Sequence, residues 1–367
     1  MINANKKIKI ALIGDSLSSG GAEKVQARLS VYFESTGIEV HHCIFLDKIE
    51  YKYAGTVFNL GKIKPNSSAI VRRPVRLKAL NDYLNTNNFN YIIDFRMRTN
   101  CILETILAKL IYPKNTIYSV RSGILDYYFV KPFFWSKYLY QTSNILAVSK
   151  ETKTKISTEL GLKNVEYIYN PIDFNEIQQL QNEFEVKEPK YIVAAGRMND
   201  TIKQFDKLIE CYSKSILPKK GIKLLFLGEG ENKIKLQSLA EQLGLRSLIE
   251  FKGFVENPFP YYKNALFTVL SSKNEGFPNV LIETLATQTP VIAFDCFSGP
   301  NEIIEHKVNG LLVENQNFDA LTEAMNQMIE KDDLYQNCKL NAKESVRKFD
   351  VEIIGQQWQN LFKNVVS

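Results

Sequence analysis

Short apolar runs alternate with longer amphipathic segments through the first half of the chain. The apolar runs are KIKIALIGD at 7–15, EVHHCIF at 39–45, YIIDF at 91–95, TIYSV at 116–120 and ILAVS at 145–149. Helix-length segments such as 22–36 and 100–111 lie between them. Strands that alternate with helices are typical of a parallel sheet covered on both faces. Residues 1–173 are therefore predicted to form one α/β domain.

A second series of the same kind follows a polar stretch rich in Gln, Glu and Lys. Its strands are expected in YIVAAGR (191–197), IKLLFLGEG (222–230), IEFKGF (249–254), LFTVLSS (266–272), TPVIAFD (289–295) and GLLVEN (310–315), with helices at 203–216, 231–243, 278–287 and 318–330. The polar stretch 174–190 is predicted to be a linker, and residues 191–349 a second doubly wound domain. Segment 350–367 has apolar residues at helical spacing, among them Trp358, and is predicted to be a C-terminal helix.

The formal net charge of +6 is unevenly distributed. Residues 1–173 contain 24 Lys and Arg against 14 Asp and Glu, a net charge of +10, whereas residues 174–367 contain 22 against 26, a net charge of −4. A basic first half suggests an anionic partner, such as a membrane surface or a phosphorylated acceptor. A basic face that serves only solubility is the alternative. Apolar residues make up 45% and charged residues 23%, which is ordinary for a globular protein.

Cysteines and histidines indicate neither disulfides nor a metal site. The five cysteines are scattered without a CxxC pair, as is typical of free thiols in a reducing cytosol. The three histidines lack metal-ligand spacing, so no structural zinc is expected. No apolar run approaches 18 residues, and the N-terminus lacks the apolar stretch of a signal peptide. We expect a cytoplasmic protein without a membrane span, for which contact with the inner face of the plasma membrane stays open.

The first candidate for chemistry is SSGGAEK at 18–24, directly after the first predicted strand. Gly20 and Gly21 allow the backbone to approach a ligand closely, and the following helix offers unpaired N–H groups to an anion or a sugar hydroxyl. A plain strand-to-helix turn is the alternative. The full GxGxxG spacing and a P-loop are absent from the sequence, which argues against a nicotinamide dehydrogenase and an ATPase.

The second candidate is a pair of cations at the start of the second domain. Arg197 follows that domain's first predicted strand, and Lys203 opens the next helix. Two cations at the carboxyl edge of a sheet suit a diphosphate, for which Arg offers a fork and Lys a point charge. Two solvated surface charges are the alternative.

The third candidate is the segment 271–295, in which Glu275 and Glu283 stand eight residues apart. Glu275 ends a strand-to-helix loop, and Pro278 is expected to begin the helix that contains Glu283, because proline is favoured in the first helical turn. The two acids can then face one cleft from different depths. Gly276 and the helix N-terminus leave backbone N–H groups for phosphate or sugar oxygens. One acidic cap plus one exposed helix acid is the alternative.

The string EGFPNVLIE at 275–283 resembles the E-x7-E signature of retaining GT-B glycosyltransferases, in their glycogen-synthase-like branch (family 4, group 1). That branch includes bacterial enzymes that build lipid-linked oligosaccharides, lipopolysaccharide and capsule. Further matches occur in the same order along the chain: GGAEK near residue 20, NPID at 170–173, GRM…K at 197–203, GEG at 228–230, FKGF at 251–254 and NG at 309–310. The resemblance covers nearly the whole chain.

The resemblance implies two Rossmann-like domains that face each other across a cleft, with the C-terminal helix crossing back onto the first domain. It implies transfer of a hexose or N-acetylhexosamine from a nucleotide-diphosphate sugar, expected to be UDP-linked, to a glycan or lipid-linked acceptor. The nucleotide sugar is a co-substrate, and no further cofactor is expected.

Residue roles are carried over from the family position by position. Arg197 and Lys203 should hold the donor diphosphate, which would stabilise the charge on the leaving phosphate without a metal ion. Glu275 should contact hydroxyls of the transferred sugar, and Glu283 the nucleotide ribose. The remaining donor-binding positions are glycines and backbone segments: Gly20, Gly21, Gly253, Phe254, Gly276, Phe277, Pro278, Asn279 and Val280.

Two departures from the family pattern stand out. The family usually places Lys five residues after Arg, whereas Arg197 and Lys203 are six apart. The family often has a histidine near residues 119–123 that holds the sugar's outer hydroxyl, whereas this chain has Arg121 there. Arg121 is therefore assigned to a phosphate or to the acceptor.

Two further segments are candidates for the acceptor or membrane side. The aromatic segment 127–140 suits a lipid interface, with packing into the first core as the alternative. The basic run at 62–78, which includes Arg72 and Arg73, suits lipid headgroups or a pyrophosphate-linked acceptor, with a solvated helix face as the alternative.

Two other classes of function stay open. One is a GT-B-fold nucleotide-sugar epimerase or phosphorylase, which would not be expected to carry EGFPNVLIE beside GRM…K. The other is a non-catalytic sugar- or nucleic-acid-binding protein, although the sequence contains no recognition motif for nucleic acid.

Overall fold

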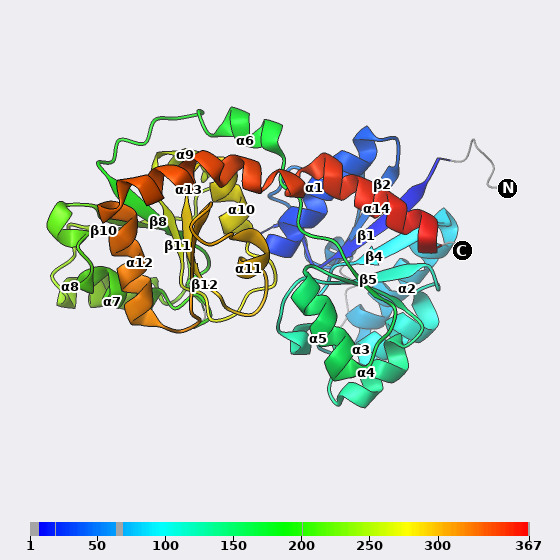
Figure 1. The fold of residues 1–367 in the computed structure, drawn as a ribbon. Helices are drawn as coiled ribbons and strands as arrows, with labels where there is room; N and C mark the ends of the chain where they lie inside the picture. Colours follow the sequence, from blue (N-terminus) through cyan, green and yellow to red (C-terminus); the bar gives the residue numbers. More distant parts are fainter. Residues whose placement is uncertain (1–6, 19, 64–68, 200, 366–367) are drawn as a thin grey trace. The chain divides into compact units, whose positions relative to one another are not determined.

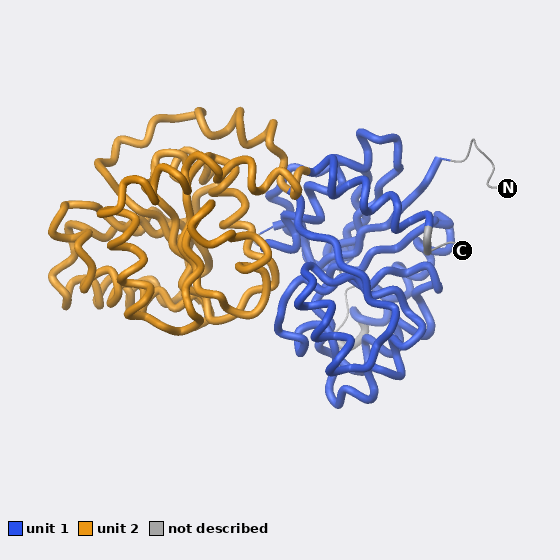
Figure 2. Tube along the Cα trace, viewed as in Figure 1, with its two compact units in different colours: residues 1–171, 351–367 blue, residues 172–350 orange. Residues whose placement is uncertain are grey.

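A computed structural model describes residues 7–18, 20–63, 69–199 and 201–365 of the 367-residue chain. It divides into two compact units (Figure 2). Unit 1 comprises residues 1–171 and 351–367, and unit 2 comprises residues 172–350. Over the described residues, no helix combines the length and the apolar character needed to cross a membrane.

Unit 1 is built on a parallel sheet of seven strands in the order β3-β2-β1-β4-β5-β6-β7. The strands are β1 (Lys9–Gly14), β2 (Glu39–Ile44), β3 (Thr56–Asn59), β4 (Tyr91–Asp94), β5 (Thr116–Val120), β6 (Asn144–Ala147) and β7 (Val165–Tyr167). The helices are α1 (Gly21–Ser35), α2 (Ala69–Asn87), α3 (Cys101–Ile106), α4 (Phe133–Tyr140), α5 (Lys150–Leu160) and α14 (Val351–Val365). A π-helical turn, Leu107–Ile111, continues α3.

Unit 2 repeats this plan with six parallel strands in the order β10-β9-β8-β11-β12-β13. The strands are β8 (Tyr191–Ala195), β9 (Lys223–Leu227), β10 (Ile249–Gly253), β11 (Thr268–Leu270), β12 (Val291–Phe294) and β13 (Gly310–Val313). The helices are α6 (Phe174–Leu180), α7 (Phe205–Lys214), α8 (Lys233–Gln242), α9 (Phe259–Asn264), α10 (Asn279–Ala286), α11 (Pro300–Ile303), α12 (Phe318–Glu330) and α13 (Asp332–Ser345). The predicted α/β class with two doubly wound sheets is confirmed.

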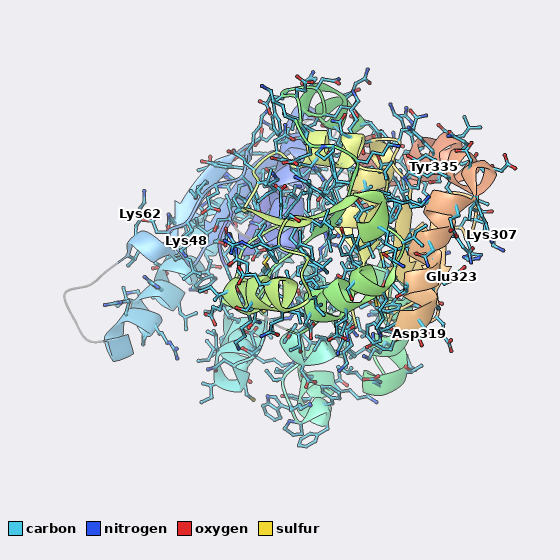
Figure 3. All side chains as sticks on the ribbon, turned by 90° about the vertical axis from the view of Figure 1, so that its left-hand side faces the viewer. Lys48, Lys62, Lys307, Asp319, Glu323 and Tyr335 are labelled. Atoms are coloured by element: carbon cyan, nitrogen blue, oxygen red, sulfur yellow. The ribbon has the colours of Figure 1, made fainter. Side chains whose placement is uncertain are left out.

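The amphipathic patterns explain how the helices cover these sheets. In α12, Leu321, Met325 and Met328 are buried in the unit 2 core. Asp319 and Glu323, one turn apart, project from the opposite side into solvent (Figure 3). A helix with one apolar and one acidic face buries the first and hydrates the second.

The linker expected at 174–190 differs in the structure. Its first half forms α6, and the whole stretch belongs to unit 2. Asp173 caps α6 by accepting hydrogen bonds from the N–H groups of Asn175 and Glu176, both at 2.9 Å. The polar residues that suggested a linker lie partly on the solvated face of this short capped helix. Phe174 and Ile177 form the buried, apolar side of α6.

The C-terminal helix α14 packs within unit 1, beside α1 (Figure 1). Ile354, Trp358 and Phe362 are buried in the same core cluster as Phe33. The Trp358 ring meets the Phe33 ring edge-on, with centroids 6.2 Å apart. The chain therefore completes the core of unit 1 with a segment that follows unit 2 in the sequence.

In both sheets the strand order reverses beside the first strand, between β1 and β4 in unit 1 and between β8 and β11 in unit 2. Open α/β sheets bind ligands at the carboxyl ends of the strands that flank such a reversal. The loops after these four strands are thus the places to look for a site.

Candidate functional site

The loops that follow β8 and β11 are joined by hydrogen bonds in unit 2. The Lys273 N–H donates to the carbonyl of Ile202 over 2.8 Å, and the Ser271 hydroxyl donates to the carbonyl of Lys203 over 2.7 Å. The Glu275 N–H in turn donates to the carbonyl of Phe297, over 2.8 Å, in the loop after β12. Three loops at one edge of the sheet therefore hold each other in place.

These loops bring together two of the predicted residues, Lys203 and Glu275. The Lys203 Nζ lies 2.6 Å from Glu275 Oε1, although the residues are 72 positions apart. The side chains keep 20% and 13% of their surface exposed, so the pair is shielded from solvent without being closed off. Lys203 reaches this position despite the six-residue spacing from Arg197.

Gly196 makes room for the stem of Lys203. A Cβ atom at Gly196 would lie 2.9 Å from Lys203 Cε, closer than side-chain contacts allow. Its φ of +154° also suits glycine. Arg197, the next residue, is exposed, and within the described residues its side chain makes no hydrogen bond to the pair. Its role in holding a diphosphate stays a prediction.

The segment after Glu275 leads into α10. The Ser298 hydroxyl donates to the Gly276 carbonyl over 2.9 Å, and Phe277 packs edge-on against Phe349. Pro278 precedes the helix instead of beginning it, and the first helical residue is Asn279. Pro278, in the N-cap position, has no side chain that could cap the helix. Backbone N–H groups at the start of a helix are natural partners of phosphate or sugar oxygens.

Gly299 holds the loop after β12 against this segment. Its φ is +102°, and a Cβ there would lie 2.7 Å from Pro278 Cδ. A larger residue would push Pro278 and the start of α10 away from the loop. Sequence reasoning missed this glycine. The SGPNE string, which places a glycine directly before a helix-starting proline, is the signal that could have found it.

Glu283 lies inside α10, as predicted, and is only 3% exposed. The alternative of an exposed helix acid is therefore wrong. Burial, and after it the negative charge of Glu283, raise the pKa of the Tyr262 hydroxyl. Glu283 thus lies close to Tyr262 in the interior of unit 2. Its contact with a ribose stays a prediction.

A second group of glycines borders the same edge of the sheet. The Gly228 N–H donates to the Gly253 carbonyl over 2.7 Å, and a Cβ at Gly230 would lie 2.4 Å from the carbonyl carbon of Met198. The loops after β8, β9 and β10 therefore touch backbone to backbone. Phe254, directly after Gly253, exposes 62% of its surface, which suits stacking against a planar base.

The predicted residues of unit 1 come from three segments of the chain. Gly20 precedes α1 and Gly21 begins it, without a side-chain cap. Arg72 and Arg73 lie on α2, where Arg73 is exposed and Arg72 half-buried. Arg121 follows β5 directly. Lys64, another member of the basic run, lies outside the described residues.

Sequence reasoning missed a buried cluster of charges at the carboxyl end of β4. Arg96 Nη2 lies 2.8 Å from Asp94 Oδ2 and 3.2 Å from Glu104 Oε2, and all three side chains are nearly inaccessible. Arg98 is also buried, among the rings of Tyr118, Tyr128, Phe129 and Tyr140. The DFRMR string directly after a strand is the signal that could have found it.

The aromatic segment 127–140 is divided between core and surface. Tyr128, Phe129, Leu139 and Tyr140 are buried in the unit 1 core, as the structural alternative expected. Phe134 and Tyr138, one turn apart on α4, expose 72% and 51% of their surface. Packing into the core is therefore confirmed for these buried residues, and a lipid interface stays a prediction for Phe134 and Tyr138.

In the part of the chain that the structure describes, no group of three or more His, Cys, Asp and Glu side chains could hold a metal ion.

Comparisons with known proteins identify this architecture. A family model described as "Glycosyl transferases group 1" matches residues 175–345. A Campylobacter jejuni protein, N-acetylgalactosamine-N,N'-diacetylbacillosaminyl-diphospho-undecaprenol 4-alpha-N-acetylgalactosaminyltransferase, is 30% identical over 93% of this chain and 96% of its own. A second C. jejuni protein, an alpha-1,4-N-acetyl-D-galactosaminyltransferase named for a GalNAc-containing diNAcBac-PP-undecaprenol, is 25% identical over 98% of this chain and 99% of its own.

Solved structures share the fold at lower identity. The sucrose-phosphate synthase of Thermosynechococcus elongatus has a TM-score of 0.79 and 19% identity over 98% of this chain and 99% of its own. Anabaena HepE in complex with UDP has a TM-score of 0.76 and 19% identity over 97% of this chain and 100% of its own. The predicted GT-B fold class is confirmed. Together with the site at the edge of the unit 2 sheet, the near-complete match to the first C. jejuni enzyme shows that this chain belongs to the group 1 glycosyltransferases.

Proposed function

We propose that this glycosyltransferase is a retaining enzyme that moves a hexose or N-acetylhexosamine from a UDP-linked donor to a glycan or lipid-linked acceptor in bacterial surface polysaccharide synthesis. The observation that carries the proposal is the ion pair of Lys203 and Glu275 at the strand-order reversal of unit 2, a few residues before α10 begins. A cation, a carboxylate and backbone N–H groups at one sheet edge suit a sugar diphosphate.

The proposed chemistry depends on charge at the leaving group. Departure of a nucleoside diphosphate builds negative charge on its β-phosphate. Lys203, Arg197 and the first N–H groups of α10 would stabilise that charge, and electrostatic stabilisation of this kind is often the largest single contribution to catalysis. With cations supplied by side chains, the proposed reaction needs no metal ion.

Glu275 has a positioning and binding role in this proposal. Its carboxylate, held by Lys203 and by the backbone bond to Phe297, would accept hydrogen bonds from hydroxyls of the transferred sugar. Attack from the same face as the leaving group, with the departing phosphate helping to deprotonate the acceptor, would give retention without a side-chain nucleophile. The carboxylate pair of glycosidases is therefore not the model for Glu275 and Glu283.

The acceptor part of the proposal is supported by the relatives and by α2. Both C. jejuni relatives are named for acceptors or products carried on a diphosphate-linked undecaprenol. Arg73 is exposed on α2, and Arg72 beside it keeps part of its surface exposed. Cationic side chains on a helix surface suit the diphosphate of such an acceptor.

Contact with an anionic membrane is supported by an exposed apolar surface on α3, its π-helical continuation and α4. Its members Ile102, Leu110, Phe134 and Tyr138 expose between 51% and 75% of their surface. Lys109 lies 4.6 Å from the centre of the Tyr138 ring, and the Trp135 indole N–H donates to the Thr105 hydroxyl, so the two helices pack side by side. Apolar side chains flanked by lysines are typical of helices that bind lipid surfaces.

The double variant Leu110→Ser/Phe134→Ser is expected to lower co-sedimentation with phosphatidylglycerol vesicles by about tenfold, because it removes two large apolar side chains from the lipid contact. The matched control is Ile234→Ser/Leu340→Ser, since these residues of unit 2 are 74% and 73% exposed. Equal binding of both double variants would contradict membrane contact through this surface.

The donor assignment is tested by thermal stabilisation against a panel of nucleotide sugars. A ligand that binds the native state raises the melting temperature, and we expect UDP-sugars to raise it more than GDP- or ADP-sugars. The shift should persist in EDTA. A shift that EDTA abolishes would refute metal independence, and a panel without any shift would refute the proposed donor class.

A further inference from the structure

The guanidinium of Arg121 is buried and has no hydrogen-bond partner among the residues that the structure describes. Arg121 follows β5 directly, at the carboxyl end of the unit 1 sheet. The residue as a whole keeps part of its surface exposed, but Nε, Nη1 and Nη2 are each inaccessible and have no hydrogen-bond partner. A guanidinium carries five donors, and none of those at Arg121 is used.

The neighbouring arginines show how this unit pairs a buried cation. Arg96 is held by the carboxylates of Asp94 and Glu104. Arg98 donates to the carbonyls of Tyr128 over 3.1 Å and Ser119 over 3.2 Å, and only its Nη2 lacks a partner. Arg121 has neither arrangement, although it directly follows β5, the strand next to β4.

The surroundings of Arg121 leave its charge uncompensated. The guanidinium carbon lies 5.3 Å from the centre of the Phe95 ring, and the Tyr128 hydroxyl lies near enough to interact electrostatically with Arg121. Burial lowers the pKa of Arg121 to about 10, so the group remains charged at neutral pH. Contact with an aromatic face offsets only part of the cost of removing a cation from water.

A buried cation that costs stability and pairs with none of the described residues is typical of a ligand site. The position supports this interpretation, because the carboxyl edge of an open α/β sheet is where such folds bind ligands. The partner that suits a planar fork of donors is a carboxylate or a phosphate, which takes two parallel hydrogen bonds.

We infer that Arg121 binds an anionic group of a substrate, through paired hydrogen bonds from its guanidinium to two oxygens of that group. The inference rests on the proposed function. Two substrate groups have this chemistry: a carboxylate on the transferred sugar and a phosphate of the acceptor diphosphate. A neutral hexose has neither, so Arg121 would select for charge.

The test compares wild type with Arg121→Gln and Arg121→Lys in calorimetric binding of three probes. UDP-glucuronic acid reports a sugar carboxylate, UDP-glucose is its neutral counterpart, and inorganic pyrophosphate in saturating UDP reports an acceptor diphosphate. We expect Arg121→Gln to raise the Kd of one of the two anionic probes by about tenfold or more. The Kd of UDP-glucose should stay within about twofold of the wild-type value. Arg121→Lys should recover part of the loss, and the probe that responds identifies the source.

A second readout separates ligand binding from a structural role. Removal of an unpaired buried charge should raise the melting temperature of the ligand-free protein, so Arg121→Met is expected to be at least as stable as wild type. Arg98→Met, which removes a hydrogen-bonded arginine, should be less stable. Arg246→Gln, at a residue whose side chain is 83% exposed, is the neutral control.

Three results would overturn the inference. Arg121→Gln could bind all three probes as wild type does, or it could lose as much affinity for UDP-glucose as for the anionic probes. The third is a melting temperature of Arg121→Met that falls as far as that of Arg98→Met. These outcomes differ from a failure of the proposed function, in which wild type would bind no UDP-sugar.

Discussion

Replacement of Glu275 by glutamine is expected to lower kcat by about 100-fold or more. Glutamine keeps the shape of the side chain but removes the charge that lies 2.6 Å from Lys203 Nζ. In the proposed site this carboxylate orients the sugar and fixes the lysine that meets the leaving phosphate. Loss of one preorganised electrostatic partner in an active site typically costs 10²- to 10³-fold in rate.

The matched control for this variant is Glu210→Gln. Glu210 also forms an ion pair with a lysine, Lys207, at 3.0 Å, but both residues lie on the outer part of α7 and are about 40% exposed. Both variants should keep the unfolding free energy within about 1 kcal/mol of wild type, because partly exposed ion pairs contribute little to stability. Wild-type turnover of Glu275→Gln would remove Glu275 from the site.

Replacement of Trp358 by alanine is expected to destabilise unit 1 by about 3–5 kcal/mol, the range typical of a large aromatic removed from a core. Its ring is fully buried and packs against Phe33 and Phe362. Because unit 2 has its own core, the effect should be confined to unit 1. Hydrogen exchange of amides in α1, α14 and β1 should accelerate, while exchange in β8 and β12 stays as in wild type.

Ile353→Ala is the control for the core variant. It shortens an apolar residue on the same helix, but Ile353 exposes 44% of its surface and leaves no cavity when truncated. Its expected effect is below about 1 kcal/mol. Equal amide hydrogen-exchange rates in the two variants would contradict the assignment of α14 to unit 1. Faster exchange in both units of Trp358→Ala would contradict it as well.

Lys203 and Glu275 could be predicted from the sequence because each stands in a short motif directly after a strand. The direction of parallel strands sends both residues to the same sheet edge, whatever the packing of the intervening helices. Most strands were predictable for a related reason, since runs such as YIVAA are long and uniformly apolar. The edge strand β3 was missed because its residues are only half-buried, which leaves TVFN without a distinct apolar pattern.

The surroundings of Arg121 could not be predicted from its neighbours in the sequence. Whether a buried arginine is paired depends on which side chains the adjacent strand and helices bring to it. Glu104 reaches Arg96 from α3, and the rings around Arg98 come from three places in the chain. The departure from the family pattern marked Arg121, but only its packing shows that no described residue forms an ion pair with it.

The return of α14 to unit 1 has a consequence for synthesis of the protein on the ribosome. Residues 172–350 can fold as soon as they have emerged, because every strand of their sheet lies within that stretch. The N-terminal sheet emerges earlier, yet the apolar surface that Trp358 and Phe362 cover stays open until residue 362 has left the exit tunnel. The half of the protein that is translated first is therefore the half that matures last, and during that interval its exposed apolar surface is open to aggregation.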